Sequence, residues 1–168
     1  MFGWTSNSSS SYFKKNIAGL DDSKKLSKIK RDNLSKLILE NSYFAYGIVS
    51  PVEIDEVNIH NASLLAMKRA ILNLSIKPSK VLVDGLYLPD IKFDKEAIIG
   101  GDSLVEEISA ASIIAKVYRD NLMLNLDKKY PHYGLAKHKG YPTKLHKEML
   151  SKYGASKIHR RSFKGVER

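Results

Sequence analysis

Two aspartates have the residue type and the surroundings to hold a divalent metal ion. Asp84 follows an apolar run at positions 81–83 and precedes a glycine, which places it at the carboxyl end of a predicted strand, where open α/β sheets bind ligands. Asp102 lies between a glycine and a serine at a predicted helix start. Carboxylate oxygens are the ligands that Mg²⁺ prefers, but two-metal phosphodiester cleavage normally uses several of them. The residues alone favour simpler roles, a turn aspartate for Asp84 and a helix N-cap for Asp102.

Cationic residues cluster in three short segments, around residues 24–25, 137–141 and 160–161, and suit contacts to phosphates. In residues 137–141, lysines precede a glycine that allows close backbone approach and a tyrosine whose ring can stack on a base or sugar. Lysines near the start of a predicted helix oppose the helix dipole, which indicates an anion to bind. A solvated basic loop explains residues 137–141 equally well. The candidate nucleic-acid contacts are Lys24, Lys25, Lys139, Tyr141, Arg160 and Arg161.

The composition favours a polyanionic partner and excludes cysteine chemistry. The 168-residue chain has 28 Lys and Arg against 18 Asp and Glu, a net charge of +10, although many basic proteins share this balance without binding nucleic acid. It has no cysteine, so any metal must bind through oxygen or histidine, and its five histidines show no metal-ligand spacing. Because neither a bilayer-length apolar run nor a signal-peptide pattern is present, we expect a cytoplasmic protein.

The apolar pattern predicts one α/β domain. A helix capped by Asp22 or Ser23 extends to Ile38, and others are predicted at residues 61–75, 104–126 and 143–153. A further helical segment begins at Ser50-Pro51-Val52-Glu53, which has the pattern of a capping box. Strands are predicted at residues 43–49 and 80–85, with a short apolar run at 97–100. This alternation predicts a sheet flanked by helices.

Several motifs, taken in order, resemble those of bacterial ribonuclease HII, the type 2 ribonuclease H. The resemblance covers roughly residues 17–166, and several motifs in the right order are far less expected by chance than any one of them. They are Asp22-Ser23-Lys24-Lys25-Leu26-Ser27, Val83-Asp84-Gly85, Gly101-Asp102, Ala110-Ala111-Ser112-Ile113-Ile114-Ala115-Lys116-Val117, Arg119-Asp120, Tyr133-Gly134, His138-Lys139-Gly140-Tyr141-Pro142-Thr143 and Ile158-His159-Arg160-Arg161-Ser162-Phe163.

The resemblance implies a ribonuclease H-like fold, with a central mixed sheet flanked by helices. It also implies a monomeric endoribonuclease of DNA replication and repair that uses Mn²⁺ or Mg²⁺. Its substrates are RNA–DNA hybrids and ribonucleotides embedded in duplex DNA, cleaved to leave 5′-phosphates. Asp84 and Asp102 match two of the family's four catalytic carboxylates, and Tyr141 matches the tyrosine thought to stack at the junction between ribonucleotide and deoxyribonucleotide.

One expected segment is absent from this sequence. Members of that family begin with a strand that ends in Asp-Glu-Ala-Gly-Arg-Gly, whereas residues 1–16 are Ser-rich and show neither helical nor strand periodicity. We therefore predict a loose, non-matching tail at 1–16 and an N-terminally truncated domain at 17–168, with an exposed sheet edge and a tendency to aggregate. Three hypotheses remain open: a ribonuclease HII in which Asp84 and Asp102 serve metal-dependent hydrolysis, a non-catalytic remnant that still binds nucleic acid, and a basic RNA-binding accessory protein, which would leave the ordered motifs unexplained. Separately, we predict that this chain is weakly active or inactive.

Overall fold

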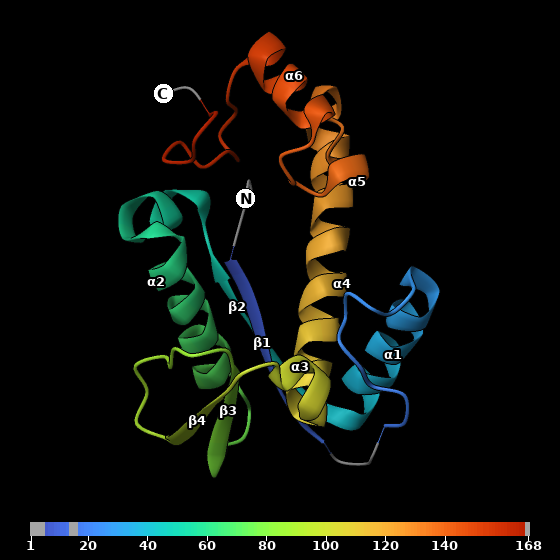
Figure 1. The fold of residues 1–168 in the computed structure, drawn as a ribbon, viewed down its shortest axis with the longest axis vertical. Coiled ribbons are helices and arrows are strands. Elements are labelled where there is room, and N and C mark those ends of the chain that lie inside the picture. Colours follow the sequence, from blue (N-terminus) through green and yellow to red (C-terminus); the bar gives the residue numbers. More distant parts are fainter. Residues whose placement is uncertain (1–5, 14–16, 167–168) are drawn as a thin grey trace. The chain divides into compact units, whose positions relative to one another are not determined.

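The computed structural model describes residues 6–13 and 17–166 (Figure 1). The chain divides into two units. The strand unit contains Asn7–Ile48 and Ser63–Val117. The C-terminal unit contains Val49–Ala62 and the chain from Tyr118 onward. Two long helices, α2 (Pro51–Leu72) and α4 (Glu106–Lys129), contribute residues to both units.

The strand unit has the predicted α/β character. Its strands form two two-stranded sheets, one of β1 (Ser6–Phe13) with β2 (Ser42–Val49) and one of β3 (Lys80–Asp84) with β4 (Asp94–Ile98). The second pair is parallel, and Asp84 lies opposite Ile98. The α/β class is thus confirmed. A central mixed sheet is predicted, whereas the described strands form two separate pairs, because no described strand is hydrogen-bonded to members of both pairs.

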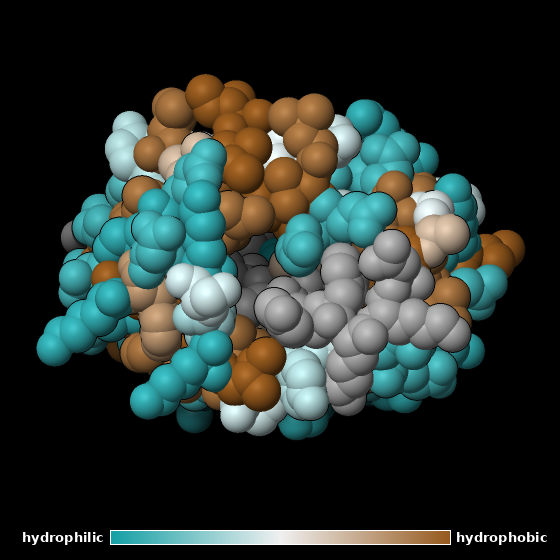
Figure 2. Space-filling view, turned by 90° about the horizontal axis from the view of Figure 1, so that it is seen from below, coloured by the Kyte–Doolittle hydropathy of each residue, from teal (hydrophilic) through white to brown (hydrophobic). Residues whose placement is uncertain are grey.

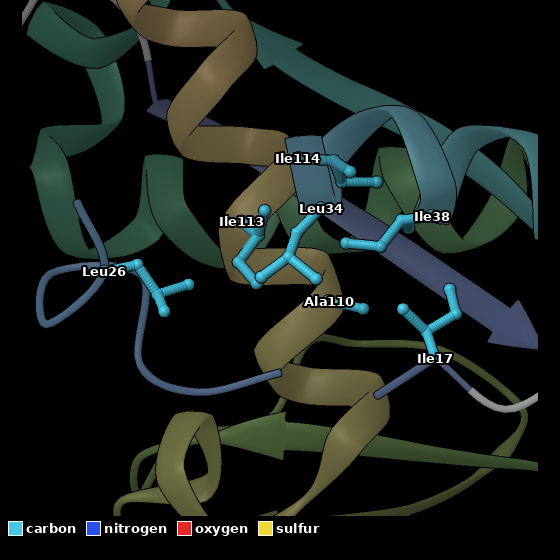
Figure 3. Close-up of a cluster of buried hydrophobic side chains, with 7 residues drawn as sticks. All are labelled: Ile17, Leu26, Leu34, Ile38, Ala110, Ile113 and Ile114. Carbon is cyan, nitrogen blue, oxygen red and sulfur yellow. The ribbon is translucent and has the colours of Figure 1, made fainter. Parts of the chain in front are cut away.

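Two apolar clusters form the core of the strand unit. In the first, side chains of α1 (Lys28–Asn41) and α4 meet those of the segment before α1, as Figure 3 shows. The cluster consists of Ile17, Leu26, Leu34, Ile38, Ala110, Ile113 and Ile114. The second joins β3 to α2 and contains Ile71, Val81, Val83 and Ile91. Burial of the alternate residues Val81 and Val83 turns that face of β3 toward the core, and therefore turns the aspartate at the end of the strand toward the other face.

The N-terminal expectations need two corrections. The predicted loose tail at 1–16 is wrong for Ser6–Phe13, which is strand β1: pairing with β2 overrides a serine-rich sequence that has no alternation of its own. The cap predicted at Asp22 or Ser23 is also wrong, because α1 begins at Lys28, where the Ser27 hydroxyl accepts a hydrogen bond from the Lys30 amide (3.3 Å). Lys24 and Lys25 therefore lie in a turn before the helix, not at its start.

Helix α2 contains both helical segments predicted in this region. Its capping box is confirmed: the Ser50 amide donates to the Glu53 carboxylate (2.8 Å), and the Glu53 amide to the Ser50 hydroxyl (3.3 Å). The helix is interrupted at Asn58, which has a left-handed φ of 68° and caps the following turn by accepting from the Asn61 amide (3.1 Å). The kink separates the two segments that the sequence predicts.

The C-terminal unit packs short helices against the second half of α4. These are the 3₁₀ turn η1 (Pro131–Tyr133), α5 (Leu135–His138) and α6 (Lys144–Tyr153). The predicted helix at 143–153 is confirmed, with Thr143 as its N-cap. The apolar cluster beneath them contains Met123, Tyr133, Leu135, Leu150 and Val166. None of the helices in the described part of the chain is both long and apolar enough to cross a membrane.

Large hydrophobic side chains are exposed around the ends of β3 and β4. The exposed fractions are 67% for Leu86, 61% for Tyr87, 71% for Ile99 and 73% for Leu104. Figure 2 shows one face of the molecule, on which hydrophobic residues lie open beside hydrophilic ones. Side chains of this kind would carry the predicted tendency to aggregate, which stays a prediction.

Within the strand unit, β2 lies directly against α2. A Cβ atom at Gly47 would be only 1.8 Å from the Ala66 carbonyl oxygen and 2.7 Å from the Ala70 amide nitrogen. Two side-chain hydrogen bonds hold the same contact, from Arg69 to the Ile48 carbonyl (2.7 Å) and from Asn73 to the Tyr46 carbonyl (3.3 Å). The close approach requires glycine at position 47.

We predict that Gly47→Ala will lower the free energy of unfolding by about 3 kcal/mol, because the added methyl group meets backbone atoms that cannot move aside. Denaturation followed by circular dichroism measures the change. The matched control is Ile48→Val, since Ile48 is 41% exposed and should change stability by less than about 0.5 kcal/mol. Equal stability of the two variants would show that the strand and helix are further apart than described.

Candidate active site

The structure brings Asp84 and Asp102 to the same turn. Asp84 ends β3 and Asp102 is in the first turn of α3 (Gly101–Leu104). The Asp84 carboxylate accepts a hydrogen bond from the Gly101 amide (2.9 Å), and the Gly85 amide donates to the Ile98 carbonyl (3.0 Å). Because Gly101 is the residue before Asp102, these bonds hold the two acidic residues close together at the carboxyl ends of β3 and β4.

Two lysines border this pair of aspartates. The Lys24 ammonium lies 3.6 Å from the Asp102 carboxylate, and the Lys25 ammonium donates to the Ser103 hydroxyl (3.2 Å) and lies 3.7 Å from the Asp21 carboxylate. Both lysine side chains are largely exposed, at 80% and 59%, while the Asp102 side chain is only 14% exposed. Exposed ion pairs contribute little stability, so the ammonium groups can exchange partners with an incoming phosphate.

Buried serines fix the segment that carries these lysines. The Ser23 hydroxyl shares a hydrogen bond with the Ser112 hydroxyl (2.8 Å), and the Ser109 hydroxyl donates to the Asp21 carbonyl (2.8 Å). Arg31 donates to the carbonyls of Ser23 and Leu26. The serine contacts attach the turn to the first half of α4. The sequence did not indicate these contacts, because only the fold brings together Ser23 and Ser112, which are 89 positions apart.

The donor set suits a hard cation but is small. Two carboxylates can bind one Mg²⁺ or Mn²⁺ whose remaining positions are filled by water and substrate phosphate. One Asp84 oxygen already accepts the Gly101 amide, which orients the carboxylate without using its other lone pairs. In the described residues, no three His, Cys, Asp or Glu side chains are grouped so that they could hold a metal together. The arrangement fits a single cation and not a fully protein-bound metal pair.

The remaining candidates lie in the C-terminal unit and are described separately. Tyr141 follows α5, and its side chain is 48% exposed. Lys139 caps α5 with a left-handed φ of 51°, and its carbonyl accepts a hydrogen bond from Arg119 (3.4 Å). The Tyr141 amide donates to the His138 carbonyl (2.8 Å), so the backbone of this loop is held from within.

The two neighbouring arginines differ in their exposure. Arg161 is exposed, whereas Arg160 is 3% exposed and its guanidinium lies 3.3 Å from the centre of the Phe163 ring. Burial, and secondly repulsion from the charge of Arg119, lowers the pKa of Arg160 to about 10. Arg160 is therefore a buried part of this segment, and Arg161 is the surface cation.

Asp55 of α2 anchors the arginine segment, a role that the sequence gave no reason to assign. Its carboxylate accepts from the backbone amides of Arg161 (2.7 Å) and Ser162 (2.9 Å) and from the Ser162 hydroxyl. Burial alone would raise the pKa of Asp55, but the hydrogen bonds from Ser162 and Arg161, together with the charge of Arg160, lower it below its ordinary value. The ionised carboxylate thus holds the backbone beside Arg161.

Comparison with known proteins identifies the family. The sequence matches the family Ribonuclease HII over residues 7–166. The chain belongs to the ribonuclease HII family. Ribonuclease HII of Borrelia hermsii (strain HS1 / DAH) is 60% identical over 148 residues, which cover 88% of this chain and 82% of that protein. The match includes residues 7–16, so the boundary predicted at residue 16 does not coincide with the start of the ribonuclease HII similarity.

Solved structures confirm the ribonuclease H-like fold. The ribonuclease H2 from Pyrococcus horikoshii OT3 is 29% identical with a TM-score of 0.74, and the similarity covers 88% of this chain and 78% of that one. Bst-RNase HIII in complex with Mn²⁺ has a TM-score of 0.72 at 17% identity, covering 89% of this chain and 56% of that one, and shows the fold alone. The ribonuclease HII family is thus supported by both sequence and fold.

We predict that Asp55→Asn will lower the free energy of unfolding by about 1 kcal/mol and will increase hydrogen exchange at the Arg161 and Ser162 amides, because a neutral amide offers one acceptor oxygen where the carboxylate offers two. Chemical denaturation and amide exchange measure the two effects. Glu56→Gln, at the next and exposed position of α2, is the control and should change neither. Unaltered exchange in the Asp55 variant would contradict the anchor.

Proposed function

We propose that this chain is an endoribonuclease that cleaves the RNA of RNA–DNA hybrids and ribonucleotides embedded in duplex DNA, with Mn²⁺ or Mg²⁺ held by Asp84 and Asp102. Membership of the ribonuclease HII family supports the reaction type. The observation that carries the assignment of residues is the hydrogen bond from the Gly101 amide to Asp84, which brings two carboxylates to one turn. With the reaction we propose a role in DNA replication and repair, as a cytoplasmic monomer.

Different residues of the chain would bind the cation, neutralise the substrate phosphates and stack on the nucleic acid. When bound, the cation supplies electrostatic stabilisation of the negative charge that develops on the phosphate. Asp84 and Asp102 bind the cation, and Gly101 orients the first of them. Lys24 and Lys25 neutralise substrate phosphates beside the two acids. In the C-terminal unit, Tyr141 stacks on the nucleic acid while Lys139 and Arg161 contact its backbone.

A second candidate is a protein that binds hybrids without cutting them. It is favoured by the small donor set, since the described residues contain two carboxylates at the turn and no group of three metal-binding side chains. Such a protein would keep the lysines and Tyr141 and would not depend on a divalent ion. Binding and cleavage must therefore be measured separately.

We predict that Asp84→Asn will reduce cleavage of a duplex containing one ribonucleotide by at least about 100-fold, because an amide binds a divalent cation far less well than a carboxylate does. The assay measures the product ends with Mn²⁺, with Mg²⁺ and with EDTA, and EDTA should abolish cutting by the unmodified chain. The control is Asp94→Asn, an exposed aspartate at the opposite end of the same pair of strands.

Two other results are informative. Cleavage that survives in the Asp84 variant would contradict the metal assignment. A chain that binds the duplex but leaves it uncut with either ion would support the second candidate and reject the first.

A further inference from the structure

Three histidines of the C-terminal unit form a buried cluster that the proposed chemistry does not use. His138, His146 and His159 are 5%, 0% and 6% exposed. The rings of His138 and His146 are stacked, with their centres 4.2 Å apart, and Nε2 of His146 lies 3.3 Å from Nε2 of His159. They are 8 and 13 positions apart in the sequence, so only the fold brings them together.

The hydrogen-bond partners determine which nitrogen of each ring carries the proton. The Ser156 amide donates to Nδ1 of His159 (3.0 Å), so His159 carries its proton on Nε2 and donates to Nε2 of His146. His146 is then protonated at Nδ1, which donates to the Tyr141 carbonyl (3.0 Å). The Gly140 amide donates to Nδ1 of His138 (3.1 Å). All three neutral rings satisfy their partners at once.

The hydrogen bonds from His159 to His146 and from His146 to Tyr141 connect two proposed nucleic-acid contacts. They end at the Tyr141 backbone and start next to the segment that carries Arg161. His159 directly precedes Arg160 and Arg161, and Asp55 accepts from the backbone amides of Arg161 and Ser162. At the other end, His146 holds the carbonyl of Tyr141, whose own side chain is half exposed. Two loops that are distant in the sequence are thus coupled through two imidazole rings.

We infer that His159 and His146 are positioning residues: their neutral imidazole rings form a relay that orders the Tyr141 loop relative to the arginine segment for binding of the hybrid. The inference rests on the proposed function, because it takes Tyr141 and Arg161 as the groups that contact nucleic acid. It adds to the proposed nucleic-acid contacts two residues, His146 and His159, that do not themselves touch the substrate.

The surroundings keep both rings neutral. Burial lowers the pKa of His146 to about 4, and the neighbouring His138 adds to the effect, although the hydrogen bond to Tyr141 opposes it. Burial, followed by the repulsion that a protonated His146 or His138 would exert, lowers the pKa of His159 to about 4 against the opposing Ser156 bond. Another titratable side chain, that of Tyr133, also packs against His159, with the two ring centres 4.9 Å apart.

Protonation should therefore destabilise the folded chain over a defined pH range. Unfolded histidines bind protons near pH 6.5, whereas His146 and His159 stay neutral down to about pH 4. We predict that the unfolding equilibrium constant will rise as the pH falls through this interval, by up to about tenfold per pH unit for each ring. Denaturant titrations from pH 7.5 to 4 measure this dependence. The matched control is His60→Asn, which removes an exposed histidine of the same unit outside the buried cluster.

A pair of substitutions separates the relay from simple loss of a side chain. The amide oxygen of Asn can replace Nδ1 of His159 and keep the Ser156 bond, but it cannot reach His146. The amide of Gln reaches the position of Nε2 and can still donate to His146. We therefore expect His159→Asn to weaken binding of a labelled RNA–DNA hybrid, measured by fluorescence anisotropy in EDTA, by about tenfold, and His159→Gln by less than about threefold.

The two variants should also separate binding from catalysis. In the cleavage assay, His159→Asn should raise KM by a similar factor and leave kcat within about twofold, since neither ring contacts the reacting phosphate. Equal affinities of the two variants would overturn the relay. Because affinity is measured without a metal ion, failure of the proposed cleavage activity, which would show as binding without product, is distinguishable from failure of the relay.

A measurement on the unmodified chain tests the relay even if a variant does not fold. Nitrogen-15 spectra of the imidazole rings at pH 7 should show His146 protonated at Nδ1, and His159 and His138 protonated at Nε2. A charged ring, or His146 protonated at Nε2, would contradict the relay directly.

Discussion

The hydrogen bond between the Gly101 amide and the Asp84 carboxylate is the constraint on which the candidate active site depends. It joins the end of β3 to the start of α3, so that a residue of the parallel strand pair and a residue of the following helix share one turn. The core beneath β3 fixes where that strand ends, and the Asp84 carboxylate fixes where α3 begins. A loss of the packing beneath β3 would therefore separate the two acids without changing either of them.

The chain combines acidic and basic groups in a way that suits a polyanionic substrate. Asp84 and Asp102 would repel phosphate on their own, but Lys24 and Lys25 border them and remain largely exposed. A divalent cation would complete the balance of charge at this turn. In the C-terminal unit, hydrogen-bonded backbones hold Tyr141 and Arg161, so binding there need not order a loose loop first.

Local sequence signals predicted much of the fold, whereas the catalytic assignment of the two acids came from the family resemblance and stays a prediction. The apolar run before Asp84, the capping box at Ser50 and the apolar pattern of the helix predicted at 143–153 each act within a few residues, and the structure has all three elements. Strand β1 was not predictable, because its serines carry no alternation and its conformation depends on β2. Asp55 and the histidine cluster were equally hidden, since their partners are distant in the sequence.

The central claim is that Asp84 and Asp102 bind one divalent cation together. Electron paramagnetic resonance of Mn²⁺, titrated into the 168-residue chain, tests it without a substrate. The account predicts one site per chain, whose affinity falls at least about tenfold in Asp84→Asn and in Asp102→Asn alike and is unchanged in Asp94→Asn. Equal Mn²⁺ affinity in all four proteins would contradict it.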